Sequence, residues 1–178
     1  MKKIIITTLL ILPLMVASAI VLNQSAGILA GEGHARTHDF TVTATSYDLD
    51  ISDTDTNGER SIKLTVPVKD IDTGIGMRNT HMRTSMFDQK NNPNIIFTAN
   101  TDAELAVGSV DLNGVLTING VSKAHVLNIT IENNSNDLIA SGQTEIILTE
   151  FDLPLVGMGP MKILDHVDMA FNIILPKQ

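Results

Sequence analysis

The chain of 178 residues contains no cysteine and no tryptophan, and aromatic residues make up only 3% of it. The absence of cysteine excludes disulfide bonds, thiolate metal ligands and a lipid-modified cysteine anchor. Because aromatic rings are so few, the core has to be filled by isoleucine, leucine, valine and methionine. At this length one domain can be stable through its core alone.

The chain also lacks a basic patch. Its formal net charge is -8, and lysines and arginines are scattered along it. Nucleic acid binding depends on basic side chains that contact phosphates. Nucleic acid is therefore excluded as a partner, and electrostatic attachment to anionic lipid is disfavoured for the same reason.

The N-terminal segment has the layout of a secretory signal: a short basic start, an apolar stretch to Leu22 and the small-x-small pattern Ala17-Ser18-Ala19. We expect a cleaved signal peptide over residues 1–19 and a periplasmic protein. The alternative is an uncleaved anchor, since the apolar stretch is just long enough to cross a bilayer. That anchor would end at about residue 22 and tether the protein to the membrane. Residues 20–39, which are small and polar from Asn23 onward, are expected to form a flexible leader before a single domain at residues 40–178.

Alternating apolar residues predict β-strands over most of that domain. The clearest are residues 62–68 and 167–175, in which every second residue is apolar. Asn113-Gly114 and Asn119-Gly120 indicate turns or bulges. The pattern predicts about eight short strands in an antiparallel barrel or sandwich, because no strand alternates with a long helix. The remaining strand candidates are residues 40–45, 47–51, 95–98, 110–118, 126–131 and 140–148.

The strand pattern is interrupted at residues 72–93. Met82 and Met86 are four residues apart and Phe87 follows, so the three share one face of a short helix. Glycines precede this helix and Pro93 follows it, and both break regular structure. The stretch therefore predicts a strand, a short helix and a strand.

The same stretch carries a family signature, which resembles that of the YceI-like polyisoprenoid-binding family. The residues that carry it are Asp72-Thr73-Gly74, Arg78-Asn79-x-His81-Met82-Arg83-Thr84, Phe87-Asp88 and Pro93-x-Ile95-x-Phe97. Residues 114–123 and, more weakly, 147–153 are similar to later blocks of the family, in the same order. The resemblance implies a lipocalin-like β-barrel without enzymatic activity or cofactor. It also implies binding and transport of a long-chain isoprenoid lipid of the polyprenyl or quinone type.

The sequence departs from the family at its start. Members open with two long strands before the position of Tyr47, whereas only residues 40–46 look like a strand here. We therefore expect an N-terminally shortened member with an open seam, through which a homodimer could form, since open strand edges pair readily.

The resemblance and the apolar pattern together suggest a lipid site. We expect strand residues to line the interior, helix residues to flank the mouth and the Met-rich loop 151–161 to form a lid. An alternative keeps the helix as a plug, with Arg78 paired to Asp72 or another carboxylate. The predicted ligand-binding residues are Phe97, Leu116, Ile118, Phe171, Met158, Met82, Met86, Phe87, Arg78 and His81.

No metal site is expected. His34 and His38 stand in the predicted leader, and the other three histidines lie far apart in the sequence. An acidic stretch after Asp53 resembles the start of a calcium loop but lacks the glutamate that such a loop needs at its twelfth position. We therefore expect an acidic hairpin turn at Asn57-Gly58.

Three functional hypotheses make different structural predictions. A lipid carrier needs a continuous apolar cavity. A structural barrel that pairs with a partner needs a packed interior and an exposed strand edge. A metal protein needs at least three histidines or carboxylates within a few ångströms of one point.

Overall fold

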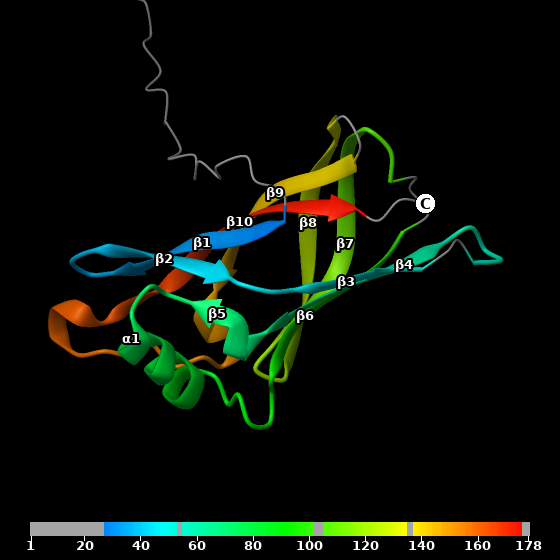
Figure 1. Ribbon diagram of the computed structural model, residues 1–178. Helices are drawn as coiled ribbons and strands as arrows, with labels where there is room; N and C mark the ends of the chain where they lie inside the picture. The colour runs from blue at the N-terminus through cyan, green and yellow to red at the C-terminus, as the bar shows by residue number, and fades with distance from the viewer. Residues whose placement is uncertain (1–26, 53–54, 102–104, 135–136, 176–178) are drawn as a thin grey trace, which may run out of the picture.

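The computed structural model describes residues 27–52, 55–101, 105–134 and 137–175. Within them, ten strands form one antiparallel sheet that curls into a half-barrel (Figure 1). This confirms the predicted antiparallel β class, although the sheet has more strands than the eight expected, and several are long. The strands are β1 (Ile28–Ala35), β2 (Asp39–Ala44), β3 (Asp48–Ile51), β4 (Arg60–Pro67), β5 (Ile71–Asp72), β6 (Asn94–Thr101), β7 (Gly108–Ile118), β8 (Val121–Asn134), β9 (Asp137–Ile147) and β10 (Ile163–Leu175).

The first strand corrects the expectation of a flexible leader. β1 pairs with β10 on one side and with β2 on the other, so residues 28–39 belong to the barrel. Its inward positions Gly31 and Gly33 carry no side chain. A Cβ atom at Gly31 would collide with Met169, and one at Gly33 would lie 2.5 Å from the Phe40 ring. The neighbouring strands therefore supply the apolar groups at these positions, and the expected shortening of the barrel is wrong.

The two edge strands of the sheet, β3 and β5, are held close to each other. Residues 45–47 connect β2, the neighbour of β5, to β3, and η1 (Val68–Asp70) connects β4, the neighbour of β3, to β5. Thr45 donates from its backbone and its hydroxyl to the Asp70 carbonyl oxygen, at 2.8 and 2.9 Å, and Ser46 donates to the Asp70 carboxylate at 2.6 Å. We predicted an open seam because one strand seemed to be missing, but that strand, β1, is present. The homodimer stays a prediction.

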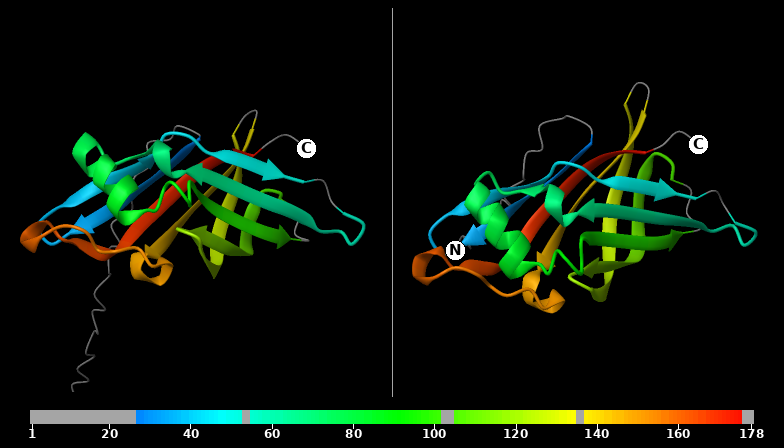
Figure 2. Two further views of the ribbon diagram at one scale, coloured as in Figure 1. Left: turned by 90° about the horizontal axis from the view of Figure 1, so that it is seen from below. Right: turned by 60° about the horizontal axis from the view of Figure 1, so that its bottom comes forward.

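The predicted helix is present as two short pieces at one end of the barrel (Figures 1 and 2). α1 (Gly76–His81) continues into the π-helical turn η2 (Met82–Met86). The Phe87 backbone N–H donates to the Met82 carbonyl oxygen at 2.8 Å, the five-residue spacing of a π turn. Both Met82 and Phe87 are buried. None of the helices in the described residues is long and apolar enough to span a membrane, and the predicted signal segment lies outside those residues.

The turns follow the sequence with one exception. Asn119 and Gly120 have positive φ angles of 50° and 79° and join β7 to β8, as predicted. Asn113-Gly114 lies inside β7 in regular pairing with β8, so the predicted turn there is wrong. Asp55 accepts hydrogen bonds from the backbone N–H groups of Asn57 and Glu59, which makes this segment the expected acidic turn.

Candidate functional site

The interior of the barrel is an apolar cavity of about 520 Å³. It lies between the sheet, the α1–η2 segment and the connection from η3 (Leu148–Phe151) to β10. The lining is overwhelmingly aliphatic and aromatic. Buried residues of β6, β7 and β10 form part of the wall: Phe97, Leu116, Ile118 and Phe171.

Nine of the ten residues predicted to bind a ligand line this cavity. Met82, Met86 and Phe87 of the helical segment face it together, so this segment both closes one end of the barrel and forms part of the cavity wall. Met158 is the exception, since it is 86% exposed and does not line the cavity. Its loop contributes Val156 and Met161 instead. Whether these residues contact a ligand stays a prediction.

Glycines on neighbouring strands fix the positions of two aromatic rings in the wall. A Cβ atom built on Gly142 of β9 would lie 2.6 Å from Cζ of Phe171 and 2.7 Å from the Asn128 carbonyl oxygen. Gly114 of β7 is equally close to the Phe97 ring, at 2.5 Å. Each ring can lie directly over its glycine only because the glycine has no side chain. A larger residue at either position would push the ring out of place. The shape of the cavity therefore depends on where the sheet has no side chain.

A hydrogen-bond network holds the helical segment over the cavity. Asn79 accepts from the backbone and hydroxyl of the buried Thr73, at 2.8 and 2.6 Å, and donates to Asp72 at 2.7 Å. The bond from Asn79 is the main reason that the pKa of the Asp72 carboxyl is lowered. The loop before α1 is thus tied to the helix by side chains rather than by a helix cap.

Arg78 forms part of the same network and does not pair with Asp72, contrary to the alternative drawn from the sequence. Its guanidinium donates to the Thr73 hydroxyl at 3.0 Å and to the Thr73 carbonyl oxygen. It also lies 4.2 Å above the centre of the Phe40 ring, as in a cation–π contact. Burial lowers the pKa of this arginine. Arg78 therefore connects the helix to β2 at the edge of the cavity.

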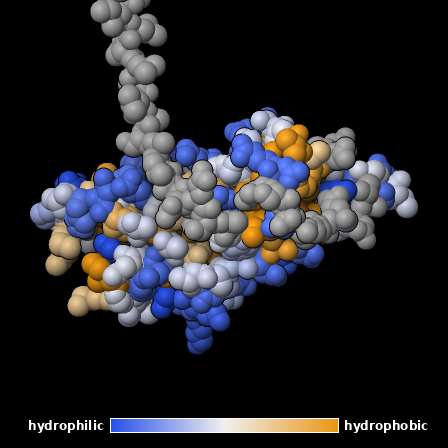
Figure 3. Space-filling view, turned by 45° about the horizontal axis from the view of Figure 1, so that its top comes forward, coloured by the Kyte–Doolittle hydropathy of each residue, from blue (hydrophilic) through white to orange (hydrophobic). Residues whose placement is uncertain are grey.

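The mouth of the cavity is largely apolar and solvent-accessible. Four large apolar residues line the cavity and are also exposed, namely Ile75, Met77, Met161 and Leu164. The exposed His38, His81 and Gly157 line it as well. The four apolar residues come from the start of α1 and from the segment around η4 (Gly159–Met161), which lie at the same end of the barrel (Figure 2). In the space-filling view this end, at the left, shows hydrophobic groups among hydrophilic ones (Figure 3). Exposed apolar side chains around an apolar cavity are typical of an entry route for a hydrophobic ligand.

One polar pair lies among the apolar residues of the cavity wall. His125 of β8 and Thr144 of β9 both line the cavity, and their Nε2 and Oγ1 atoms are 2.7 Å apart. Burial lowers the pKa of His125, so the imidazole is neutral at pH 7. Sequence reasoning treated His125 as an isolated histidine, because its partner stands on another strand.

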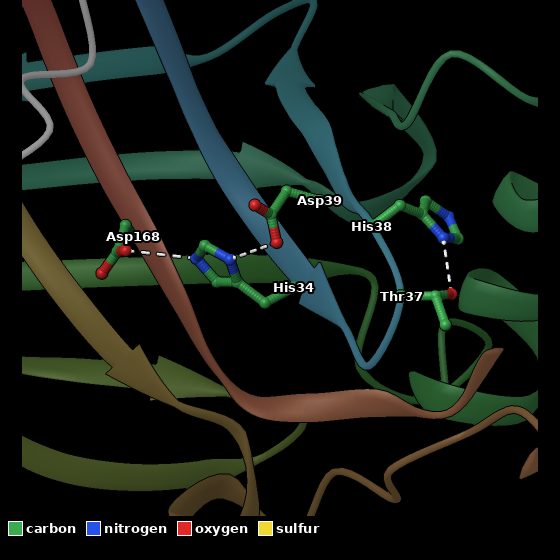
Figure 4. Close-up of polar contacts among 5 residues, drawn as sticks. All are labelled: His34, Thr37, His38, Asp39 and Asp168. Carbon is green, nitrogen blue, oxygen red and sulfur yellow. Dashed lines mark hydrogen bonds and ion pairs between the residues drawn. The ribbon is translucent and has the colours of Figure 1, made fainter. Parts of the chain in front are cut away.

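A second polar group stands where β1, β2 and β10 meet. Nδ1 of His34 is 2.8 Å from Oδ1 of Asp39, and Nε2 is 3.2 Å from Oδ2 of Asp168 (Figure 4). The His34 ring also stacks on His166, with ring centres 4.5 Å apart. Burial acts to lower the pKa of His34, but its hydrogen bonds with the two carboxylates outweigh that effect and the pKa is raised. Sequence patterns could not reveal this group, because its members come from opposite ends of the chain.

Fold and cavity together define a class: an antiparallel β-barrel with an apolar interior that opens beside a short helix. The model of the YceI-like domain matches residues 23–175. The chain therefore belongs to the YceI-like family, as its sequence signature predicted.

Solved structures agree in fold. BcnA of Burkholderia cenocepacia has a TM-score of 0.68 at 18% identity, covering 84% of this chain and 96% of its own. A polyisoprenoid-binding domain from Saccharophagus degradans, implicated in plant cell wall breakdown, has a TM-score of 0.67 at 22% identity, with coverages of 82% and 90%. The YceI protein of Campylobacter jejuni has a TM-score of 0.56 at 19% identity, with coverages of 76% and 85%. Among curated proteins, none matches the sequence.

Proposed function

We propose that this protein binds and carries a long-chain isoprenoid lipid, of the polyprenyl or quinone type, without enzymatic activity. The observation that carries the proposal is the continuous apolar cavity of about 520 Å³ beneath an apolar mouth. A structural barrel would instead fill its interior with side chains. The name of the Saccharophagus degradans domain, which describes polyisoprenoid binding, supports the same class of ligand.

The cavity is suited to a hydrocarbon chain. Its volume lies within the range of about 300–1,000 Å³ that is usual for small-molecule and cofactor sites. Each buried methylene contributes about 0.8 kcal/mol, which corresponds to roughly a fourfold change in Kd. Five methionines line the cavity, and they suit a flexible, branched ligand because thioether side chains adapt to irregular shapes. They are Met77, Met82, Met86, Met161 and Met169.

The polar pair in the wall suits a neutral head group. A neutral His125 that contacts Thr144 through Nε2 keeps Nδ1 for a ligand hydroxyl or carbonyl. Arg78, the cation at the cavity edge, already donates to Thr73. The arrangement therefore favours a prenyl alcohol or quinone over a ligand whose affinity depends on a charged phosphate.

A chain-length series tests the proposal. Prenyl alcohols of increasing length are titrated into the delipidated protein, and affinity should rise with each isoprene unit until the cavity is filled. Leu116→Trp places an indole inside the cavity and should weaken binding at least tenfold. Val115→Trp is the matched control, since Val115 is the next residue of β7 and is 41% exposed on the other face.

Unfolding in urea shows whether the Leu116→Trp variant keeps its fold. The proposal is contradicted if this variant is folded and binds the longest alcohol as tightly as the parent does. It is also contradicted if affinity does not change with chain length.

The proposed site of action is the periplasm, supported by the basic start, the apolar stretch and Ala17-Ser18-Ala19. Cell fractionation with intact-mass measurement tests this. We expect a periplasmic form that begins at Ile20. A full-length form in the membrane fraction would support the anchor instead, and a cytoplasmic full-length form would contradict export.

A further inference from the structure

The register of β1 and β10 brings two histidines and an aspartate from distant parts of the chain together. His166 and Asp168 are two residues apart on β10, so their side chains share one face of the strand. The pairing of β1 with β10 is irregular between Gly33 and Ala35, opposite this segment, which places His34 beside both. One potential ligand atom from each of His34, His166 and Asp168 lies within 4.8 Å of the other two.

The cluster stands at the rim of the cavity, because His34 and His166 are among the residues that line it, whereas Asp39 and Asp168 are not. In the β1–β2 pair, Gly33 stands opposite Phe40, whose ring lines the cavity, and His34 stands opposite Asp39. Successive side chains of a strand point to opposite faces. His34 and Asp39 therefore point away from Phe40. The Asp39 and Asp168 side chains are 53% and 45% exposed, so the cluster is reached from solvent.

The hydrogen bonding around His34 is that of a metal-binding histidine. In such sites one ring nitrogen binds the metal and the other donates its N–H to a carboxylate that orients the ring. Asp39 occupies the orienting position, 2.8 Å from Nδ1 (Figure 4). Nε2 is 3.2 Å from Oδ2 of Asp168, and once a metal ion displaces the proton between them, these two atoms can bind it together. Two ligands of one tetrahedral zinc ion stand about 3.4 Å apart when each bond is about 2.1 Å, so this separation is suited to a shared ion.

We propose that His34, His166 and Asp168 form a binding site for a divalent transition-metal ion, Zn²⁺ in the first place, with Asp39 as the residue that orients His34. Two imidazoles and one carboxylate are a ligand set that zinc and its neighbours prefer to calcium or magnesium. The ion would join β1 to β10 at the end of the barrel that carries the apolar mouth. His34 and His166 also line the cavity, so the ion would stand beside the proposed lipid site, but the proposal rests on the ligand atoms of the cluster and not on lipid binding.

Titration of the metal into protein purified without an affinity tag tests the site. Zn²⁺ is followed by calorimetry, and Co²⁺ by its visible absorption, which reports the geometry of its ligands. We expect one ion per chain. Both His166→Asn and Asp168→Asn should weaken binding at least tenfold, and Asp39→Ala should weaken it by about 10–100-fold, as loss of an orienting carboxylate does.

His38→Asn is the matched control, because His38 is exposed in the turn between β1 and β2 and contacts Thr37 rather than the cluster. This variant should bind Zn²⁺ like the parent. Unfolding curves without metal show that each variant is folded, and Zn²⁺ should raise the unfolding midpoint of the parent and of His38→Asn only. The proposal is overturned if the parent binds no Zn²⁺, or if folded His166→Asn and Asp168→Asn variants bind it as tightly as the parent.

Discussion

A single methyl group at Gly142 should both destabilise the barrel and alter its cavity. A Cβ atom there would lie 2.6 Å from the tip of the Phe171 ring and 2.7 Å from the backbone oxygen of Asn128. The Phe171 ring lines the cavity, and the backbone oxygen belongs to the neighbouring strand β8, where pairing with β9 leaves it little freedom. In Gly142→Ala we therefore expect a displaced ring and a strained β8–β9 pair.

The size of the effect follows from this crowding. Extra methylenes forced into a packed region usually cost about 1–3 kcal/mol. With a urea m-value of about 2 kcal/mol/M, that cost lowers the unfolding midpoint by roughly 0.5–1.5 M. Gly76→Ala is the matched control, because Gly76 is exposed at the start of α1 and a Cβ atom there meets nothing within 4 Å. It should leave stability unchanged or raise it by about 0.4–1 kcal/mol.

Urea unfolding of the two variants and the parent, together with the chain-length series, gives both readouts. Gly142→Ala should unfold earlier and prefer shorter ligands, because the displaced Phe171 ring occupies part of the cavity. If Gly142→Ala is as stable as Gly76→Ala and binds the full series like the parent, then the ring does not depend on the missing side chain and the reasoning is refuted.

Two further predictions concern the helical segment and the polar pair. Asn79→Ala removes the oxygen that accepts from the buried Thr73 hydroxyl and its backbone N–H and should cost about 1–3 kcal/mol, with faster hydrogen exchange confined to residues 72–88; exchange that is unchanged there would show that the network does not hold the segment. For His125, burial lowers the folded-state pKa, with the nearby Glu150 acting in the opposite direction. The unfolded state therefore binds the proton more readily, and this contribution to stability is complete above a pH of about 6.5 and is lost as the pH falls through the folded pKa. The free energy of unfolding of His125→Gln should thus fall less than that of the parent below about pH 6.5, and parallel pH profiles would contradict this.

The regular strands and the helical segment could be predicted because their signal is local. In β10 the inward positions Phe171, Ile173 and Leu175 are apolar and buried, so alternation alone reveals the strand. β1 could not be found in this way. Its inward positions at Gly31 and Gly33 are filled by Met169 and Phe40 of the neighbouring strands, so its own sequence carries little apolar alternation.

The candidate site shows the same limit. Apolar residues on predicted strands, such as Phe97 and Leu116, do line the cavity, because period-two alternation fixes which face they share. The polar groups could not be paired from sequence. His34 and Asp168 meet only through the register of β1 with β10, and His125 meets Thr144 only across β8 and β9. Cross-strand neighbours of this kind are set by register, which short sequence motifs do not specify.

Native mass spectrometry of the protein purified from the organism that makes it shows whether the cavity carries an isoprenoid lipid. The mass is measured before and after extraction with organic solvent. We expect an added mass that matches a polyprenyl or quinone lipid, that disappears on extraction and that returns when an isoprenoid is supplied. A bare protein mass that stays unchanged when isoprenoids are offered would contradict the proposed function.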